Sequence, residues 1–403
     1  MTSHRTFCAA LMAAAASFAM PAAAETVKIG VMTDLSGPDS DMAGSGSILA
    51  AQMAIEDFGD KAGGFDIELV SADHQRKPDV AAALALRWYD NEGVDVILDV
   101  PLSSAGLAVQ EIARERGKVA IFSTSATSDL TGKACSPTGF HWTYDTTAVS
   151  HGTATAVTQN GGDTWFFLTS DYAFGHALEA DSSKVIEENG GKVLGAVRHP
   201  VQNPDFSSFL LQAQASGAKV VGLANSASDL TASVRQANEF GLQQSGQNVA
   251  ALLAFITDIH SLGLDIAQGT YLTESFYWNL NDETREWSAR FAARHGGVQP
   301  TMIQAGIYSA TQHYLKAIDA IGSKEGLAVS NKMKEIPVDD FMTDNAEIWP
   351  SGWVNRDFYL FQVKSPEESE GPWDYYKLVR RIPAQDAKPL GSDDACSLMT
   401  AKK

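Results

Sequence analysis

The stretch IGVMTDLSGP, residues 29–38, joins a short apolar strand to a polar turn, and a segment of helical period follows it. The same order of buried strand, turn and helix recurs along the first 270 residues. Strands are predicted at residues 27–33, 67–72, 94–100, 119–123, 164–169, 192–198, 219–224, 249–256 and 270–277. Helices are predicted at residues 46–58, 79–91, 104–116, 146–159, 174–188, 206–215 and 229–240. Near-continuous apolar strands that alternate with helices indicate parallel sheets covered on both faces.

Chain length decides between one sheet and two. In a chain of 403 residues, two sheets of about four to six strands are favoured over a single sheet of about nine or more. We therefore predict an α/β, doubly wound fold in two lobes, with the first change of lobe near residues 142–145. From Asp282 onward the pattern is mostly helical, and it ends in two further strands at residues 357–363 and 373–379.

The N-terminal segment has the pattern of an export signal. Arg5 precedes an apolar run at residues 7–20, and the small residues Pro-Ala-Ala-Ala follow it. The run is shorter than the ~20 residues that a membrane-spanning helix needs. Cys8 stands before the apolar core, whereas lipid attachment would need a cysteine after it. We expect residues 1–24 to be a cleaved signal peptide and the mature protein to be exported.

Charge and cysteine content narrow the partners and the compartment. A formal charge of −19 makes nucleic acid and anionic membranes poor partners, although it does not imply a cationic ligand. Two cysteines, Cys135 and Cys396, remain after loss of the signal peptide. In an oxidising compartment an even pair suggests one disulfide that ties the C-terminal tail to a loop, and two free structural thiols are the alternative.

Motifs for catalysis or cofactor binding are absent from the sequence. There is no P-loop, dinucleotide fingerprint, His-Glu-x-x-His or Gly-x-Ser-x-Gly, and the nine histidines lack metal-ligand spacing. His74 and His176 are candidates for a general base, but no nucleophile or carboxylate partner is placed near them by the sequence, which favours a surface or structural role. We therefore expect no enzyme activity, no metal and no cofactor.

Hydroxyl-rich turns follow three of the predicted strands. In open α/β sheets, ligands bind at the carboxyl ends of the strands, where helix N-termini present free N–H groups. A carboxylate could be held there by backbone N–H groups and hydroxyls without any lysine or arginine. The alternative is that Ser104, Ser128 and Asp171 only cap the helices that follow them. The residues of these turns that we consider for binding are Ser103, Ser104, Ser125, Ala126, Thr127 and Tyr172.

The order and spacing of short motifs along the chain carry a family resemblance. They are LSGP at 35–38, AAQMAI at 50–55, VPLSS at 100–104, STSAT at 123–127, DYAFG at 171–175 and VRQA at 234–237. Together, behind a signal peptide, they make the mature chain similar to the Leu/Ile/Val-binding family of periplasmic binding proteins.

This resemblance implies a type I binding protein. Two Rossmann-like lobes, joined by a three-crossing hinge, would close on a small ligand and present it to an ABC permease in the inner membrane. The first lobe would comprise residues 25–145 and 279–349, and the second residues 146–278 and 350–403. A periplasmic monomer is expected.

The resemblance also implies roles for residues in the turns. Ser103 or Ser104, with residues 125–127, would anchor the ligand carboxylate. Met42 takes the place of an aromatic residue that commonly covers the ligand, and Tyr172 matches an aromatic residue of the second lobe.

The chain departs from the family where specificity is set. Ser226 lies in a stretch where amino-acid binders often have a tyrosine. Asp258, with Asp229 as second choice, is the acid nearest to the position that pairs with a ligand ammonium. Asp258 would equally serve as a helix cap.

Aromatic residues gather at the two predicted hinge crossings. Phe276, Tyr277 and Trp278 lie at the second, and Trp142 and Tyr144 at the first. They either pack the hinge or form an apolar slot for a flat ring, and we include Tyr277 among the binding residues. The expected ligand is thus a small amino acid or a hydrophobic or aromatic acid. A ligand-sensing receptor of the same fold and, more distantly, an exported hydrolase are the alternatives.

Overall fold

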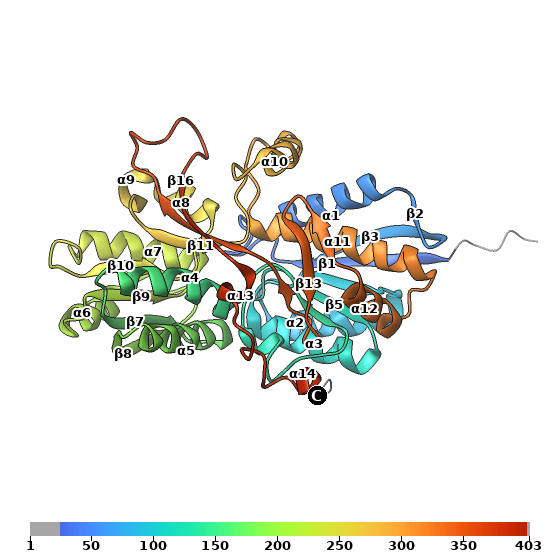
Figure 1. Cartoon of the computed structure of the whole chain (residues 1–403), viewed down its shortest axis with the longest axis horizontal. Coiled ribbons are helices and arrows are strands. Elements are labelled where there is room, and N and C mark those ends of the chain that lie inside the picture. Colours follow the sequence, from blue (N-terminus) through green and yellow to red (C-terminus); the bar gives the residue numbers. More distant parts are fainter. Residues whose placement is uncertain (1–24, 401–403) are drawn as a thin grey trace, which may run out of the picture.

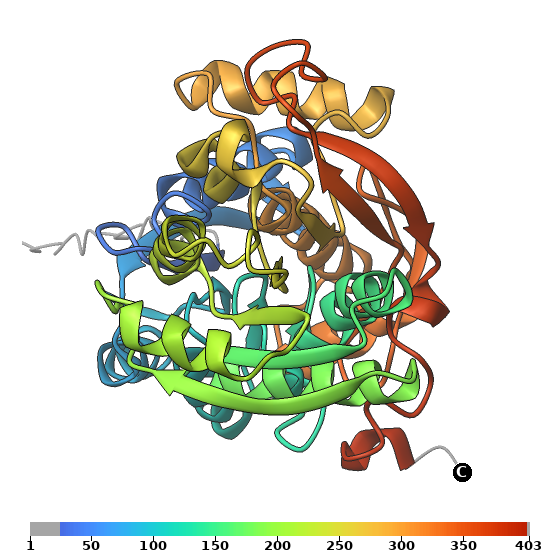
Figure 2. The ribbon, with the colours of Figure 1, turned by 90° about the vertical axis from the view of Figure 1, so that its left-hand side faces the viewer.

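The computed structural model describes residues 25–400, so the predicted signal peptide at residues 1–24 lies outside the described part of the chain. Two α/β lobes lie side by side in Figure 1, the first mostly blue to cyan with orange helices, the second green to yellow. Figure 2 shows the second lobe facing the viewer. Within residues 25–400, no helix is both long and apolar enough to cross a bilayer.

The first lobe is built on a six-stranded sheet in the order β2-β3-β1-β4-β5-β6, parallel except at the β2–β3 edge. Its strands are β1 (Thr26–Thr33), β2 (Lys61–Ala62), β3 (Phe65–Asp73), β4 (Val96–Asp99), β5 (Val119–Phe122) and β6 (Gly139–His141). The helices of this segment are α1 (Gly44–Phe58), α2 (Pro78–Arg87) and α3 (Ser103–Arg116). A π-helical turn at Trp88–Glu92 continues α2, and a 3-10 turn lies at Ser128–Leu130.

Burial on both faces of this sheet explains why the opening strand is apolar throughout. Ile29 and Val31 belong to a buried cluster that includes Met53 of α1, whereas Met32 belongs to the cluster that includes Val109 of α3. Alternate side chains of β1 therefore enter two different cores, which a strand covered on one face only would not do.

The second lobe has a four-stranded parallel sheet in the order β10-β9-β7-β8. Its strands are β7 (Thr164–Ser170), β8 (Lys192–His199), β9 (Val220–Ala224) and β10 (Asn248–Ala251). Its helices are α4 (Thr146–Gln159), α5 (Ala173–Glu188), α6 (Ser207–Ala215), α7 (Ala227–Glu239), α8 (Ile256–Leu262) and α9 (Leu264–Ala267). A second, antiparallel sheet of the order β11-β15-β16 packs beside it, with β11 (Tyr271–Glu274), β15 (Phe358–Val363) and β16 (Tyr376–Ile382).

The elements after β11 return to the first lobe. They are α10 (Asp282–Arg294), α11 (Met302–Ile321), α12 (Gly326–Glu335), β12 (Val338–Asp340), β13 (Thr343–Ile348) and β14 (Val354–Asn355). Near the chain end, α13 (Ala384–Ala387) packs on α4 of the second lobe, and α14 (Ser397–Thr400) follows. The helix α11 packs along α1. The chain passes between the lobes after β6, after β11 and after β14, as Figure 1 shows. The predicted doubly wound, two-lobed fold with three hinge crossings is confirmed.

Two predicted strands end several residues earlier than expected. The strand predicted at 249–256 stops at Ala251, and Ile256 already begins α8. The strand predicted at 270–277 stops at Glu274, where the chain enters the hinge. In both places the residues beyond the strand are buried without pairing in a sheet, so their apolar character reflects burial by other elements.

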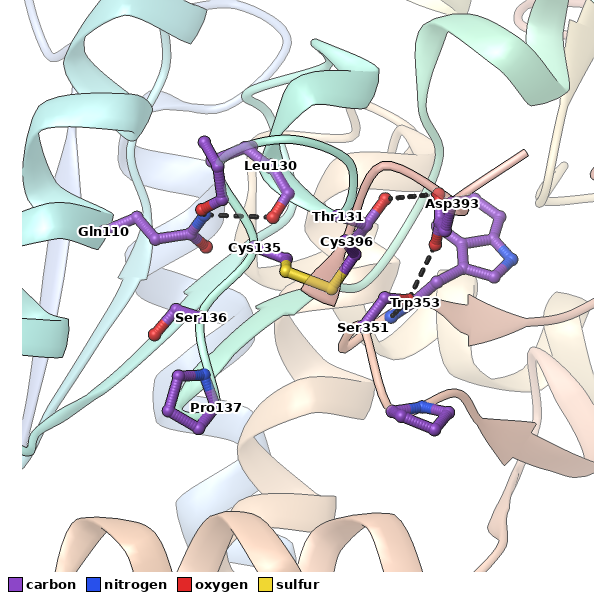
Figure 3. The surroundings of a disulfide bond; sticks show 12 residues. Gln110, Leu130, Thr131, Cys135, Ser136, Pro137, Ser351, Trp353, Asp393 and Cys396 are labelled. Carbon is purple, nitrogen blue, oxygen red and sulfur yellow. Dashed lines mark hydrogen bonds between the residues drawn. A yellow bond between two sulfur atoms is a disulfide. The ribbon is translucent and has the colours of Figure 1, made fainter. Parts of the chain in front are cut away.

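Cys135 and Cys396 form a disulfide across 261 residues of sequence, which confirms the predicted pairing. Figure 3 shows Asp393 beside this bond, where its carboxylate accepts hydrogen bonds from Thr131 Oγ1 at 3.1 Å and Ser351 Oγ at 2.6 Å. The tail, which the sequence-based division places in the second lobe, is therefore fastened to residues of the first. In Figure 1, α14 accordingly lies beneath the first lobe.

A fully buried ion cluster joins the same tail to the first hinge crossing. Lys388 Nζ contacts the carboxylates of Asp145 and Asp393, the latter at 2.7 Å, and it donates a hydrogen bond to Thr131 Oγ1 at 2.9 Å. Its ammonium also lies 4.4 Å from the ring centroid of Trp353. Asp145 in turn caps α4 by accepting the N–H of Ala148.

Candidate ligand-binding site

A small cavity lies between the two lobes. Residues of both lobes line it, and most of them are apolar or aromatic. The lining residues are Asp39, Met42, Leu102, Ser103, Thr124, Ala126, Tyr144, Tyr172, Phe174, Ser226, Leu253 and Phe255.

Five helices begin at this cavity. The residues that precede α3, α5, α7 and α8 line it, and Met42 lies just before α1. The first turns of α1, α3, α5 and α7 have no side-chain cap. Their free N–H groups and the positive ends of their dipoles make the cavity suitable for an anionic group.

The capping alternative fails for all three residues proposed for it, because none of them is the side-chain cap of its helix. Ser104 makes no cap for α3, and Asp171 instead pairs with His176 at 2.8 Å on the surface. In the third turn, Thr127 and not Ser128 is the cap, because Thr127 Oγ1 accepts the N–H of Asp129. His176 is thus a surface residue, and His74 is buried without lining the cavity.

The loop after β4 has an unusual backbone. Asp99, Val100 and Leu102 all have positive φ, at 81°, 56° and 75°. This region is uncommon for residues other than glycine and is an outlier for β-branched valine, and such strain collects at functional sites. Here it turns Leu102 and Ser103 towards the cavity at the beginning of α3.

Ser103 connects this loop with the loop after β5. Its Oγ accepts the N–H groups of Ala126 at 3.2 Å and Thr127 at 3.1 Å. Ser125 Oγ donates back to the carbonyl of Val100, so its side chain points away from the cavity. Of the predicted carboxylate anchors, Ser103 and Ala126 line the cavity, whereas Ser104, Ser125 and Thr127 lie behind it.

The polar end of the opening strand shapes the loop that carries Asp39 and Met42. The Asp34 carboxylate accepts the N–H groups of Gly37 at 2.8 Å and Asp39 at 3.1 Å. A side chain at Gly37 would come within 2.4 Å of Asp34 Oδ2, so only glycine fits there. Thr301 Oγ1 donates to the carbonyl of Met42 and fastens this loop to the start of α11. The turn thus holds both side chains at the cavity wall.

Asp39 is the charged residue of the lining, and the sequence-based reasoning missed it. Its side chain is 2% exposed, and its Oδ2 lies 2.9 Å from Arg76 Nε. Burial raises the pKa of Asp39 to about 6, although Arg76 lowers it. The guanidinium of Arg76 also lies 6.0 Å from the ring centroid of Tyr172, so it reaches across to the second lobe.

Aromatic rings line the cavity, as expected: Tyr144 and Tyr172 are among the aromatic residues considered from the sequence, and Phe174 and Phe255 are not. Tyr144 lies 5.9 Å from Phe255, and Tyr172 lies 5.8 Å from Phe174, measured between ring centroids. Tyr277 is not in the lining: its ring packs on Phe361 and Tyr376, and its hydroxyl donates to the carbonyl of Trp373.

Phe174 and Phe255 were missed for different reasons. Phe174 lies within the DYAFG motif, two residues after Tyr172. Its place directly after a strand was the signal that could have identified it as a cavity residue. Phe255 and Leu253 were assigned to a strand, and their apolar character gave no sign that they lie in a loop. Ser226 lines the cavity at the start of α7, as we predicted.

Asp258 does not line the cavity and acts in the local structure of α8. Its Oδ2 accepts the N–H of Phe255 at 2.9 Å. Asp258 therefore acts as a helix-capping residue, which was the alternative to a ligand contact. Asp229 likewise accepts the N–H groups of Gln202 and Asn203. Burial raises the pKa of Asp258 from 3.8 to about 7.

Asp258→Asn is expected to stabilise the protein at pH 8 by roughly 2–4 kcal/mol. Because the folded-state pKa of Asp258 lies above the unfolded value, this group costs stability as pH rises from about 4 through 7. The gain should therefore shrink towards zero by about pH 4. Urea unfolding at several pH values would measure it, with the exposed acid of α9, Asp265→Asn, as control. A gain that does not depend on pH would contradict the assignment.

A cavity between two hinged α/β lobes, with helix N-termini beside it, defines a protein that binds a small molecule. The chain belongs to the periplasmic binding protein family, whose model matches residues 26–371. The resemblance seen in the sequence is confirmed.

Individual relatives agree with this assignment. A crystal structure of a periplasmic binding protein from Burkholderia mallei is 44% identical, covers 93% of this chain and 99% of its own, and superposes with a TM-score of 0.91. A branched-chain amino acid ABC transporter periplasmic ligand-binding protein from Burkholderia xenovorans LB400 is 39% identical, covers 93% of this chain and 100% of its own, and has a TM-score of 0.82. The Leu/Ile/Val-binding protein homolog 6 of Brucella suis is 26% identical over 77% of this chain and 80% of its own length.

Proposed function

We propose that this protein is the periplasmic solute-binding component of an ABC importer for a small carboxylate with a hydrophobic or aromatic body. The observation that carries the proposal is the convergence of uncapped helix N-termini on a cavity with aromatic walls. N–H groups and the Ser103 hydroxyl would hold the carboxylate, and Met42, Tyr172 and Phe255 would pack on the body of the ligand.

Transport is favoured over the alternative functions by the relatives. The Burkholderia xenovorans protein is described as an ABC transporter component, and the Brucella protein as a Leu/Ile/Val-binding homologue. Closure of the lobes would exclude water from the site, strengthen its polar contacts and let a permease distinguish loaded from empty protein. The protein would act as a monomer and leave its ligand chemically unchanged.

A thermal-shift screen followed by calorimetry tests this function. The panel contains leucine, isoleucine, valine and phenylalanine beside benzoate, 4-hydroxybenzoate and cinnamate. A ligand at 100 times its dissociation constant should stabilise the protein by about 2.7 kcal/mol. Recovery of the ligand unchanged after incubation separates a binder from a hydrolase. No shift with any carboxylate would contradict the proposed ligand class.

Ser103→Ala is expected to weaken binding of the best carboxylate by roughly 10- to 100-fold, since it removes a hydrogen bond to a charged group and the acceptor that orders Ala126 and Thr127. Ser104→Ala is the matched control, because Ser104 is the next residue but does not line the cavity. Calorimetry of both variants measures the difference. Equal affinities in the two variants would contradict the role of Ser103.

A further inference from the structure

Within residues 25–400, one carboxylate oxygen in the cavity wall has no hydrogen-bond partner. Asp39 Oδ2 is paired with Arg76, but Oδ1 is buried and accepts no hydrogen bond from the residues that the structure describes. A buried acceptor without a donor is costly, and nearly all such atoms in folded proteins are satisfied. Because Asp39 lines the cavity, a bound molecule is the natural source of the missing donor.

The charges around Asp39 favour a positively charged donor. Asp34, on its own loop, and Asp229, from the second lobe, both lie close enough to act on it electrostatically. Asp258, from the second lobe, is influenced by Asp39 and Asp41 in the same way. The backbone N–H groups bound by Asp34 and Asp229 do not cancel a full charge. Arg76 is the cation that pairs with Asp39, so acidic groups outnumber cations at this end of the cavity.

The Asp39 carboxylate is positioned by its loop and by the ion pair that its Oδ2 makes with Arg76. The loop is shaped by Asp34, and Arg76 binds Oδ2 while its guanidinium lies near the Tyr172 ring of the opposite lobe. The position of Oδ1 is therefore defined by contacts within the loop and with Arg76. A carboxylate held in this way discriminates between ligands by their charge and hydrogen-bonding groups, because it does not change position from one ligand to another.

We propose that Asp39 is a specificity-determining residue whose free Oδ1 binds a protonated amine of the ligand, with Arg76 as the positioning residue. This inference rests on the proposed carboxylate-binding function. The amine would be recognised from the loop after β1 in the first lobe, and not by Asp258, whose carboxylate is engaged with the N–H of Phe255. The ligand would then bring a carboxylate to the helix N-termini and an amine to Asp39.

Two pairs of ligands that differ only in the amine provide the test. They are leucine against 4-methylpentanoate, and phenylalanine against 3-phenylpropanoate, each measured by calorimetry. In the unmodified protein the amine-bearing member of at least one pair should bind about 10- to 100-fold more tightly. Asp39→Asn should remove most of this preference. Asp41→Asn, two residues further along the same loop and exposed, should keep it.

Each outcome has a definite meaning. The inference is overturned if the preference for the amine-bearing ligand survives Asp39→Asn. It is also overturned if the unmodified protein binds carboxylates without that preference. Both results leave the proposed function intact. A preference only for a neutral hydroxyl, as in 4-hydroxybenzoate over benzoate, overturns the assignment of an amine. Failure of every carboxylate to bind overturns the proposed function itself. If Asp39→Asn does not fold, the double variant Asp39→Asn, Arg76→Gln removes both charges together and is read in the same way.

Discussion

Replacement of Lys388 with methionine will lower the free energy of unfolding by about 3–5 kcal/mol, because it leaves two buried carboxylates without their counter-ion. Lys388 is 0% exposed, and its ammonium contacts Asp145 and Asp393, which are also buried. Burial alone would lower the pKa of Lys388, but the two carboxylates hold it above its usual value. The lysine is therefore charged, and its removal leaves negative charge in the interior.

Because the ion cluster of Lys388, Asp145 and Asp393 joins several parts of the chain, its disruption should cost more stability than loss of a single ion pair. Asp145 caps α4 at the first hinge crossing, and Asp393 accepts hydrogen bonds from Thr131 and Ser351. Lys388 thus connects the tail, the hinge and the first lobe. Urea unfolding followed by circular dichroism would measure the change.

Two controls separate this effect from a general cost of losing a lysine. Lys184→Met removes an exposed lysine that lies 4.0 Å from Glu188, and it should change stability by less than about 0.5 kcal/mol. Adding Asp145→Asn to Lys388→Met should restore part of the stability, because asparagine keeps the helix cap and carries no charge. Equal stability of Lys388→Met and Lys184→Met would show that the cluster contributes nothing.

Loss of the disulfide is expected to have a similar effect. Cys135→Ser combined with Cys396→Ser should lower the free energy of unfolding by about 3–5 kcal/mol, since the bond joins residues with a sequence separation of 261 and so closes a long loop in the unfolded chain. It also holds the tail against the first lobe, beside the contacts of Asp393 (Figure 3).

Reductant supplies the control for the disulfide. It should shift the urea midpoint of the unmodified protein towards that of the double variant, and it should leave the double variant unchanged. An unmodified protein that is indifferent to reductant, with thiols found free by mass mapping, would contradict the bond.

The two-lobed fold could be predicted because its signals are local. A strand such as β1 is apolar at successive positions only because both of its faces are buried, and helical period separates it from the next strand. Prediction failed where apolar residues had another reason to be buried. Leu253 and Phe255 extended a predicted strand, but they line the cavity from a loop.

Within the candidate site, the loops were predictable and the side chains that face the ligand were only partly so. Ser103 and Ser104 are chemically identical neighbours, and the backbone at Leu102, with φ of 75°, decides which one faces the cavity. Asp39 was overlooked because its partner, Arg76, lies 37 positions away in the sequence. The pairing of Asp39 and Arg76 exists only after β1 and β3 lie side by side.

The sequence by itself determined the α/β fold with its two lobes and the placement of binding loops at the carboxyl ends of strands. It suggested the bond between the two cysteines, which the structure confirms. Burial and helical periodicity produce local patterns of apolar and polar residues, so they can be recognised from the sequence alone. Only the tertiary structure decided that Asp39 and Phe255 line the cavity, that Asp258 and Tyr277 do not, and that the tail is fastened to the first lobe. These features depend on loop dihedral angles and on contacts between distant segments, which no local pattern specifies.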